Sequence, residues 1–170
     1  VIYMNTHALN LNEIRGFGRK KPMLKIVFLV GALAIGGIPG FGGYISKTLI
    51  HESIVEYGAT EIMKFVEYVF LFSGGLTVAY MTKISKAVFF EKNTDPEVQE
   101  KFDAKKDYMN PVSAAALTVS AGILLVWGLF PHQLMDRFAE TAQGFMNFHP
   151  HGEPHIVAYF SFVNLKGALI

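Results

Sequence analysis

The distribution of charged side chains is the feature that most constrains this 170-residue chain. Between Lys25 and Lys47, about 21 consecutive residues carry no charge, enough for a helix to cross a bilayer core of roughly 30 Å. A second charge-free stretch of about 24 residues covers residues 108–131, and a shorter one of about 15 covers residues 68–82. Only 17% of the residues are charged, against roughly 25% in soluble domains. The pattern predicts an all-α, polytopic transmembrane helix bundle.

The first apolar segment, residues 22–57, is too long for one straight span. Unbroken, it would form a helix of about 54 Å, far longer than the bilayer core is thick. Glycine and proline interrupt it at residues 36–43, which predicts one discontinuous helix. Further spans are predicted at about residues 64–88 and 110–131, and the start of another from about residue 155. The residues of the predicted break are Gly36, Gly37, Pro39, Gly40, Gly42 and Gly43.

Lysine and arginine alternate between the connecting loops. They concentrate at about residues 10–25 and 83–107, whereas the turn after the first segment carries glutamates and no basic residue. By the positive-inside rule both basic loops are predicted in the cytoplasm of a multi-pass inner-membrane protein. Residues 91–107 are predicted as a solvated loop with a short helix after Asp95-Pro96. Because the chain begins with Val1 and turns apolar again from Tyr159, we expect a fragment of one longer membrane domain.

Lys47 follows the predicted break, and its expected environment depends on that break. Along an unbroken helix, Lys47 lies about 32 Å from Ile26, at the outer interface, where a lysine is an ordinary anchor. A break within the bilayer must be buried in protein or line a water-filled cavity. Residues after the break then lie less far across the bilayer than straight counting gives, which places Lys47 inside the membrane, facing a polar interior. There a lysine is a candidate functional residue. Spacing alone leaves both interpretations open.

Three further ionisable residues are candidates for a proton pathway with Lys47. His51 lies on the same helix face, and histidine is the residue type that ordinarily exchanges protons near neutral pH, so His51 either forms a relay with Lys47 or marks the outer helix end. Glu67 is either interfacial or faces a neighbouring helix, and Lys83 lies at the cytoplasmic end, where anchoring is the default. A patch of small residues in the same segment predicts close helix packing: Ser73, Gly74, Gly75 and Thr77.

Several kinds of site find no support in the sequence. The chain has no cysteine, which excludes thiolate zinc sites, iron–sulfur clusters and c-type haem attachment, and no metal, cofactor or catalytic residue is predicted. Residues 42–48 lack the glycine before lysine that a Walker A motif requires. The histidine-containing loop 149–155 is predicted as a solvated outer loop rather than a metal site. The near-neutral net charge gives no argument for nucleic acid.

Two stretches resemble a known family of membrane subunits. Residues 14–22 (IRGFGRKKP) and 37–47 (GIPGFGGYISK) are similar to the antiporter-like subunits of respiratory complex I, membrane-bound hydrogenases and multi-subunit Na+/H+ antiporters. The second stretch fits the family pattern G-x-P-x-x-x-G-[FY]-x-x-K. The resemblance covers residues 11–90 well, including a helix that ends in a basic residue at Lys83, and residues 111–170 only in hydropathy.

The resemblance implies a function. In that family the lysine matched by Lys47 lies in the second of two discontinuous helices and belongs to a central chain of buried ionisable residues that conducts protons. The chain is thus expected to be a proton-translocating subunit of a redox-driven complex, of the NADH dehydrogenase or hydrogenase type. Its partners would be the lipid bilayer and the other membrane and peripheral subunits, which carry the electron transfer. The alternatives are the large subunit of a multi-subunit Na+/H+ antiporter and a non-transporting structural membrane subunit.

Overall fold

The computed structural model describes residues 1–57, 60–145, 157–162 and 164–165. Every regular element in these ranges is a helix, which confirms the predicted all-α class. The predicted loop 149–155 and the beginning of the predicted last segment lie outside the described residues. The helices are α1 (Ile2–Thr6), α2 (Leu11–Ile14), α3 (Pro22–Gly36), α4 (Gly42–Glu56), α5 (Glu61–Phe89), α6 (Pro96–Ala104), α7 (Pro111–Leu129) and α8 (Pro131–Phe145).

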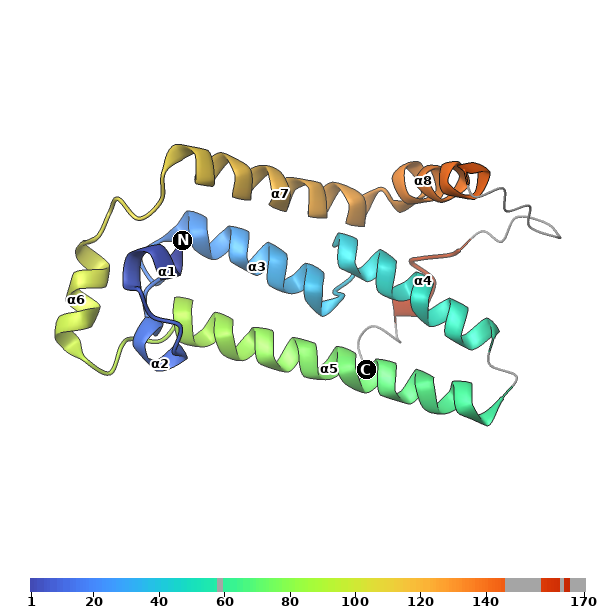
Figure 1. Cartoon of the computed structure of the whole chain (residues 1–170), viewed down its shortest axis with the longest axis horizontal. Coiled ribbons are helices and arrows are strands. Elements are labelled where there is room, and N and C mark those ends of the chain that lie inside the picture. Colours follow the sequence, from blue (N-terminus) through green and yellow to red (C-terminus); the bar gives the residue numbers. More distant parts are fainter. Residues whose placement is uncertain (58–59, 146–156, 163, 166–170) are drawn as a thin grey trace.

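The long helices lie side by side, with α3 and α4 between α5 and α7 (Figure 1). α3, α4 and α7 run in one direction and α5 runs in the other (Figure 1). The start of α3, the end of α5 and the start of α7 therefore meet at one end of the molecule, beside α1, α2 and α6. Helices α5 and α7 are long and apolar enough to cross a membrane, whereas α3 is apolar but shorter.

The connector before α3 packs against the C-terminal end of α5. The backbone N–H groups of Gly16 and Gly18 donate to the carbonyls of Ala87 and Val88, at 2.9 Å each. These carbonyls belong to the last turn of α5, where helix carbonyls lack partners within the helix. Phe17 lies between the two glycines and is buried in the hydrophobic cluster at this end. We call this contact, made by residues 15–21 with residues 87–108, the clamp.

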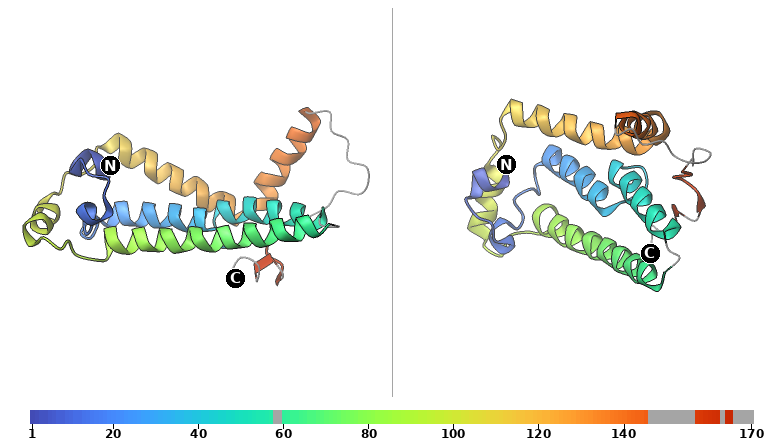
Figure 2. Two further views of the ribbon diagram at one scale, coloured as in Figure 1. Left: turned by 60° about the horizontal axis from the view of Figure 1, so that its bottom comes forward. Right: turned by 45° about the vertical axis from the view of Figure 1, so that its right-hand side comes forward.

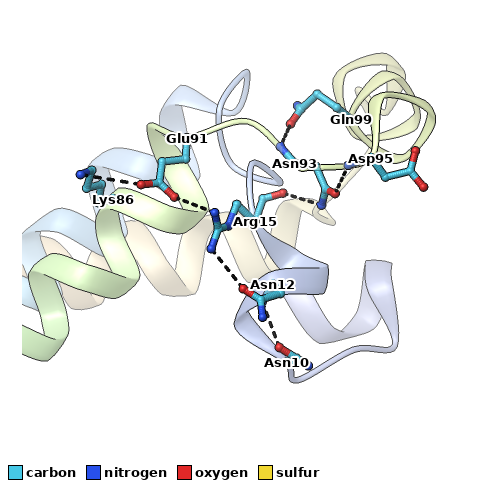
Figure 3. A network of polar contacts seen from close by, with 8 residues as sticks. All are labelled: Asn10, Asn12, Arg15, Lys86, Glu91, Asn93, Asp95 and Gln99. Carbon is cyan, nitrogen blue, oxygen red and sulfur yellow. Dashed lines mark hydrogen bonds and ion pairs between the residues drawn. The ribbon is translucent and has the colours of Figure 1, made fainter.

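A polar network extends the clamp to the loop after α5 (Figure 3). Arg15 forms an ion pair with Glu91 at 3.4 Å, and the side chain of Asn93 donates to the carbonyl of Arg15 at 3.0 Å. Gln99 of α6 accepts from the backbone N–H of Asn93 at 2.7 Å. Asp95 caps α6 by accepting from its first turn at 2.9 Å. The predicted short helix is thus present, and it is fixed to the connector.

Lys21 is buried at the centre of the clamp, which the sequence did not predict. Its side chain is 2% exposed, and Nζ donates to the carbonyls of Phe17 at 3.0 Å and Phe102 at 2.7 Å. The ammonium also lies over the rings of Phe17, 4.3 Å from its centroid, and Tyr108, 5.4 Å away. Burial lowers the pKa of Lys21, and the charge of Asp103 partly opposes that effect. Lys21 therefore joins the connector, α6 and the segment that leads to α7.

The structure has a helix directly after α7, where the sequence analysis predicted none. Residues Pro131–Phe145 form α8, which leaves the end of α7 at an angle (Figure 2). Pro131 suits the first position of a helix, and Leu134, Met135 and Phe138 recur at helical spacing between polar residues. That amphipathic pattern was present in the sequence, but the search for charge-free stretches did not detect it.

Replacement of Lys21 by alanine is expected to destabilise the protein by about 1–3 kcal/mol, because two buried carbonyls lose their donor. The matched control is Lys20→Ala. Lys20 has a side chain that is 62% exposed and forms an ion pair with Asp103 at 3.0 Å. Losing this exposed ion pair is expected to lower the stability by at most about 1 kcal/mol. Thermal unfolding of the full-length protein in detergent measures both. If the two variants destabilised the protein equally, the buried contacts of Lys21 in the clamp would not be the source of its stabilising effect.

Candidate functional site

The backbone of Gly37 ends α3. Gly37 has φ 78° and ψ 32°, in the left-handed region that favours glycine. Its N–H donates to the carbonyl of Ala34 and the N–H of Ile38 donates to the carbonyl of Leu33, at 3.0 Å each. These are the two hydrogen bonds of a Schellman motif. Pro39 then lacks the N–H that would continue the helix. The stop is therefore encoded locally by a glycine and a proline.

Lys47 reaches back from the second turn of α4 to the end of α3. Its Nζ donates to the carbonyl of Gly36 at 3.1 Å. A positive charge at the carbonyl end of a helix is favourable because it opposes the helix dipole. A Cβ added to Gly37 would lie only 2.6 Å from Cδ of Lys47, so Gly37 also leaves room for the lysine stem. The half-buried lysine thus caps the broken helix end from the far side of the break.

Helix α7 encloses the break on the opposite side. A Cβ on Gly128 would collide with the backbone of Gly40 and Phe41, and one on Gly42 would lie 3.3 Å from the carbonyl oxygen of Leu124. Glycine at these positions permits close approach between α7 and residues 40–42. Helix α7 therefore covers residues 40–42 on this side, and residues 38–43 as a whole are half-buried.

A cavity of about 470 Å³ lies beside Lys47, between α4 and α5. Thr48 and His51 of α4 line it with Lys47. Phe70, Leu71 and Val78 line the cavity from α5, and small residues lie between them: a Cβ on Gly74 would lie 4.0 Å from the lysine Nζ. The small residues predicted for helix packing line this cavity instead: Ser73, Gly74, Gly75 and Thr77.

One turn after Lys47, His51 contacts Glu67 of α5. The distance between His51 Nε2 and Glu67 Oε1 is 3.1 Å, and the imidazole stacks on Phe70 with ring centroids 6.3 Å apart. Helices α4 and α5 are antiparallel, so residues equally far from the turn between them face each other. The sequence indicated both residues separately but not their contact. The near-equal spacing of His51 and Glu67 from the connection between α4 and α5 is the signal that pairs them.

Lys83 lies apart from these three residues. It is exposed and follows Glu67 by about 24 Å along α5. The structure therefore brings together Lys47, His51 and Glu67 near the break, and Lys83 lies towards the clamp. Among the described residues, no three or more histidine or carboxylate side chains form a group that could hold a metal ion.

A second polar group on α4 was missed by the sequence analysis. The hydroxyl of buried Tyr44 donates to the carbonyl of Tyr159 at 2.5 Å, and the hydroxyl of Tyr159 donates to Asp136 of α8 at 2.8 Å. Asn164 donates to Glu52 at 2.8 Å. These bonds join α4 to Tyr159 and Asn164, and Tyr159 in turn joins α8. No local pattern relates residues so far apart in the chain, so the sequence offered no signal for them.

Comparisons with known proteins agree with the resemblance described above. Residues 1–73 match a family model described as NADH:quinone oxidoreductase/Mrp antiporter, transmembrane. The chain is 27% identical over 126 residues to NADH-quinone oxidoreductase subunit N of Francisella tularensis subsp. holarctica, covering 74% of this chain and 24% of that protein. It is 25% identical over 139 residues to F(420)H(2) dehydrogenase subunit N of Methanosarcina mazei, covering 82% and 26%. It is 26% identical over 145 residues to NAD(P)H-quinone oxidoreductase chain 4 of Prochlorococcus marinus, covering 83% and 25%.

These matches confirm the similarity to antiporter-like membrane subunits and identify the chain as part of a membrane protein. The chain spans about a quarter of the length of these curated relatives. No solved structure gives a significant match.

The contact between Gly37 and Lys47 predicts a non-additive pair of substitutions. Gly37→Ala is expected to lower the free energy of unfolding by about 1–2 kcal/mol, because alanine is strained in the left-handed backbone region. A second loss of stability comes from displacing the side chain of Lys47. In a Lys47→Ala background the second term disappears, so the cost of Gly37→Ala falls. Gly31→Ala is the control, since a Cβ there meets no atom within 4 Å. Thermal unfolding of the full-length protein and of the single and double variants gives a double-mutant cycle. Strictly additive effects of Gly37→Ala and Lys47→Ala would contradict the contact.

Proposed function

We propose that this chain is part of a proton-translocating, antiporter-like membrane subunit of a redox-driven complex. The observation that carries the proposal is the half-buried Lys47, hydrogen-bonded to Gly36 at a helix break and bordering a cavity. The relatives named above are subunits of quinone oxidoreductases and an F(420)H(2) dehydrogenase, which favours a redox complex over a secondary Na+/H+ antiporter. Electron transfer belongs to partner subunits in this proposal, and the chain contributes the ion path.

The proposal includes a membrane topology. α3 and α4 form one discontinuous transmembrane helix of an inner-membrane, multi-pass bundle, and α5 and α7 form the next two spans. Two observations support it: the helices alternate in direction, and the basic residues of 10–25 and 83–107 gather at one end. That end is the cytoplasmic side by the positive-inside rule. The pathway residues near the break then lie towards the outer half.

In this mechanism Lys47 alternates between ammonium and neutral amine. The carbonyl of Gly36 and the end of α3 favour the ammonium, whereas desolvation inside the membrane protein favours the neutral amine, so modest charge movements in partner subunits can shift the balance. A proton released from Lys47 Nζ passes through the cavity to the free ring nitrogen of His51. His51 then releases a proton from Nε2 to Glu67 Oε1, and Lys83 supplies positive charge on the cytoplasmic side.

Capping and proton transfer by Lys47 can be separated experimentally. Lys47→Ala is expected to reduce coupled proton translocation by at least about tenfold while assembly survives, because losing a hydrogen bond from a charged donor costs about 1.5–3 kcal/mol, less than the roughly 5–15 kcal/mol that stabilises a folded domain. Lys47→Arg keeps a charged donor that does not deprotonate. It is expected to preserve thermal stability and still lose translocation.

The measurement is proton uptake by inverted membrane vesicles during electron transfer by the assembled complex. Lys64→Ala serves as the control, because Lys64 is exposed and pairs only with its neighbour Glu61 among the described residues. Normal proton translocation by the Lys47→Arg variant would overturn the proposed titration of this lysine. If both Lys47 variants lost thermal stability, the result would assign Lys47 to the capping role.

The His51–Glu67 contact gives a second test of the path. Glu67→Gln keeps the shape and a hydrogen-bonding group but removes the proton acceptor, and is expected to lower translocation by at least about tenfold. The control Glu61→Gln changes an exposed carboxylate about one and a half turns earlier on α5, and it should leave proton translocation unchanged. If His51→Ala and Glu67→Gln were each harmless in the same vesicle assay, the path would not pass through this pair.

A further inference from the structure

A second, largely apolar cavity of about 370 Å³ lies between α3 and α5, and it shares Gly36, Ile38 and Val78 with the cavity beside Lys47. Leu29, Ala32 and Leu33 line it from α3, and Val78 and Met81 line it from α5. Leu33 and Val78 keep 38% of their surfaces exposed, so these apolar walls are not closed by other described residues. The cavity is therefore a groove along the helix pair, which we call the α3–α5 groove.

The end of the groove near the clamp is cationic. Lys86 lines it, and the side chain of this lysine is 70% exposed. Phe90 closes this end, and Nζ of Lys25 lies 4.8 Å from the centroid of its ring. The nearest carboxylate, Glu91, is shared between Lys86 at 3.8 Å and Arg15 at 3.4 Å (Figure 3). One carboxylate among three cations leaves this end positively charged.

The dimensions of the groove match one lipid leaflet. On α3 it extends from Leu29 to Gly36 and then to Ile38, about 13 Å along the axis. One leaflet provides about half of the bilayer core of roughly 30 Å. An apolar groove of this length with cations at the membrane surface fits one acyl chain below one negatively charged headgroup. A neutral lipid would fill the groove but leave the cations without a partner.

We infer that the α3–α5 groove binds an anionic phospholipid. One acyl chain lies against Leu29, Leu33 and Met81, and the phosphate lies between Lys25 and Lys86. The inner end of the chain reaches Gly36, which lines both cavities and whose carbonyl accepts the hydrogen bond from Lys47. The site is independent of the proposed proton path, because it would bind lipid whether or not Lys47 titrates.

The test uses the full-length protein in its complex, reconstituted in phosphatidylcholine vesicles with a trace of photoreactive lipid. The photoreactive group is on the acyl chain of either phosphatidylglycerol or phosphatidylcholine. We expect mass spectrometry to find labelling in residues 29–38 and 78–82, several-fold stronger from phosphatidylglycerol. Lys86→Gln should reduce that labelling by roughly fivefold, the factor that corresponds to about 1 kcal/mol for one basic residue at an anionic surface.

Two control variants make the test specific. Lys83→Gln also removes one positive charge. Lys83 lies one turn from Lys86 but does not line the groove, so this variant should leave labelling within about twofold. Ala32→Trp fills the groove and should abolish labelling of residues 78–82 by both lipids. Equal labelling from the two lipids, insensitive to Lys86→Gln, would overturn the inference in favour of unspecific boundary lipid. No labelling from either lipid would overturn it in favour of a protein segment that covers the groove.

Discussion

The hydrogen bond from Lys47 to the carbonyl of Gly36 is the interaction on which the arrangement around the break depends. The end of a helix leaves its last backbone carbonyls without partners inside the helix. The Schellman turn at Gly37 satisfies two of them, and Lys47 satisfies a third from the next helix. Because the lysine must reach back to α3, the start of α4 is held close to the end of α3. That position in turn sets which residues of α4 face α5.

The clamp fixes the other end of the same helices. Residues 15–21 bind the last carbonyls of α5 and surround Lys21, so α3 begins at a defined height beside the end of α5. With the ends of α3 and α5 joined there, the register between these helices is set over their full length. Lys47 then lies opposite the small residues near Gly74, and His51 opposite Glu67. The two lysines thus stabilise opposite ends of α3, one through the connector and one through the break.

The sequence predicted those parts of the molecule that depend on local chemistry. The all-α class, the short helix after Asp95 and the similarity to antiporter-like subunits could all be inferred from composition, capping residues and motifs. The burial of Lys21 could not, because a lysine in a basic run has no local sign that its neighbours will exclude water. The contact between His51 and Glu67 depends on the register of two helices about a turn, and it follows only once both helices are known to be antiparallel. The bond from Tyr44 to Tyr159 depends on chain segments with no shared pattern.

Capping and titration by Lys47 are compatible because of how an amine donates. The ammonium has three N–H donors and the neutral amine retains two, so the hydrogen bond to Gly36 can persist after the proton is lost. Only the charge term is removed, namely the favourable interaction with the carbonyl end of α3. A hydroxyl cap would carry no charge to exchange, and a guanidinium cap would not release its proton. A lysine is therefore the residue that can hold the helix end in both protonation states. For that reason a structural role at the break does not count against the proposed role in proton transfer.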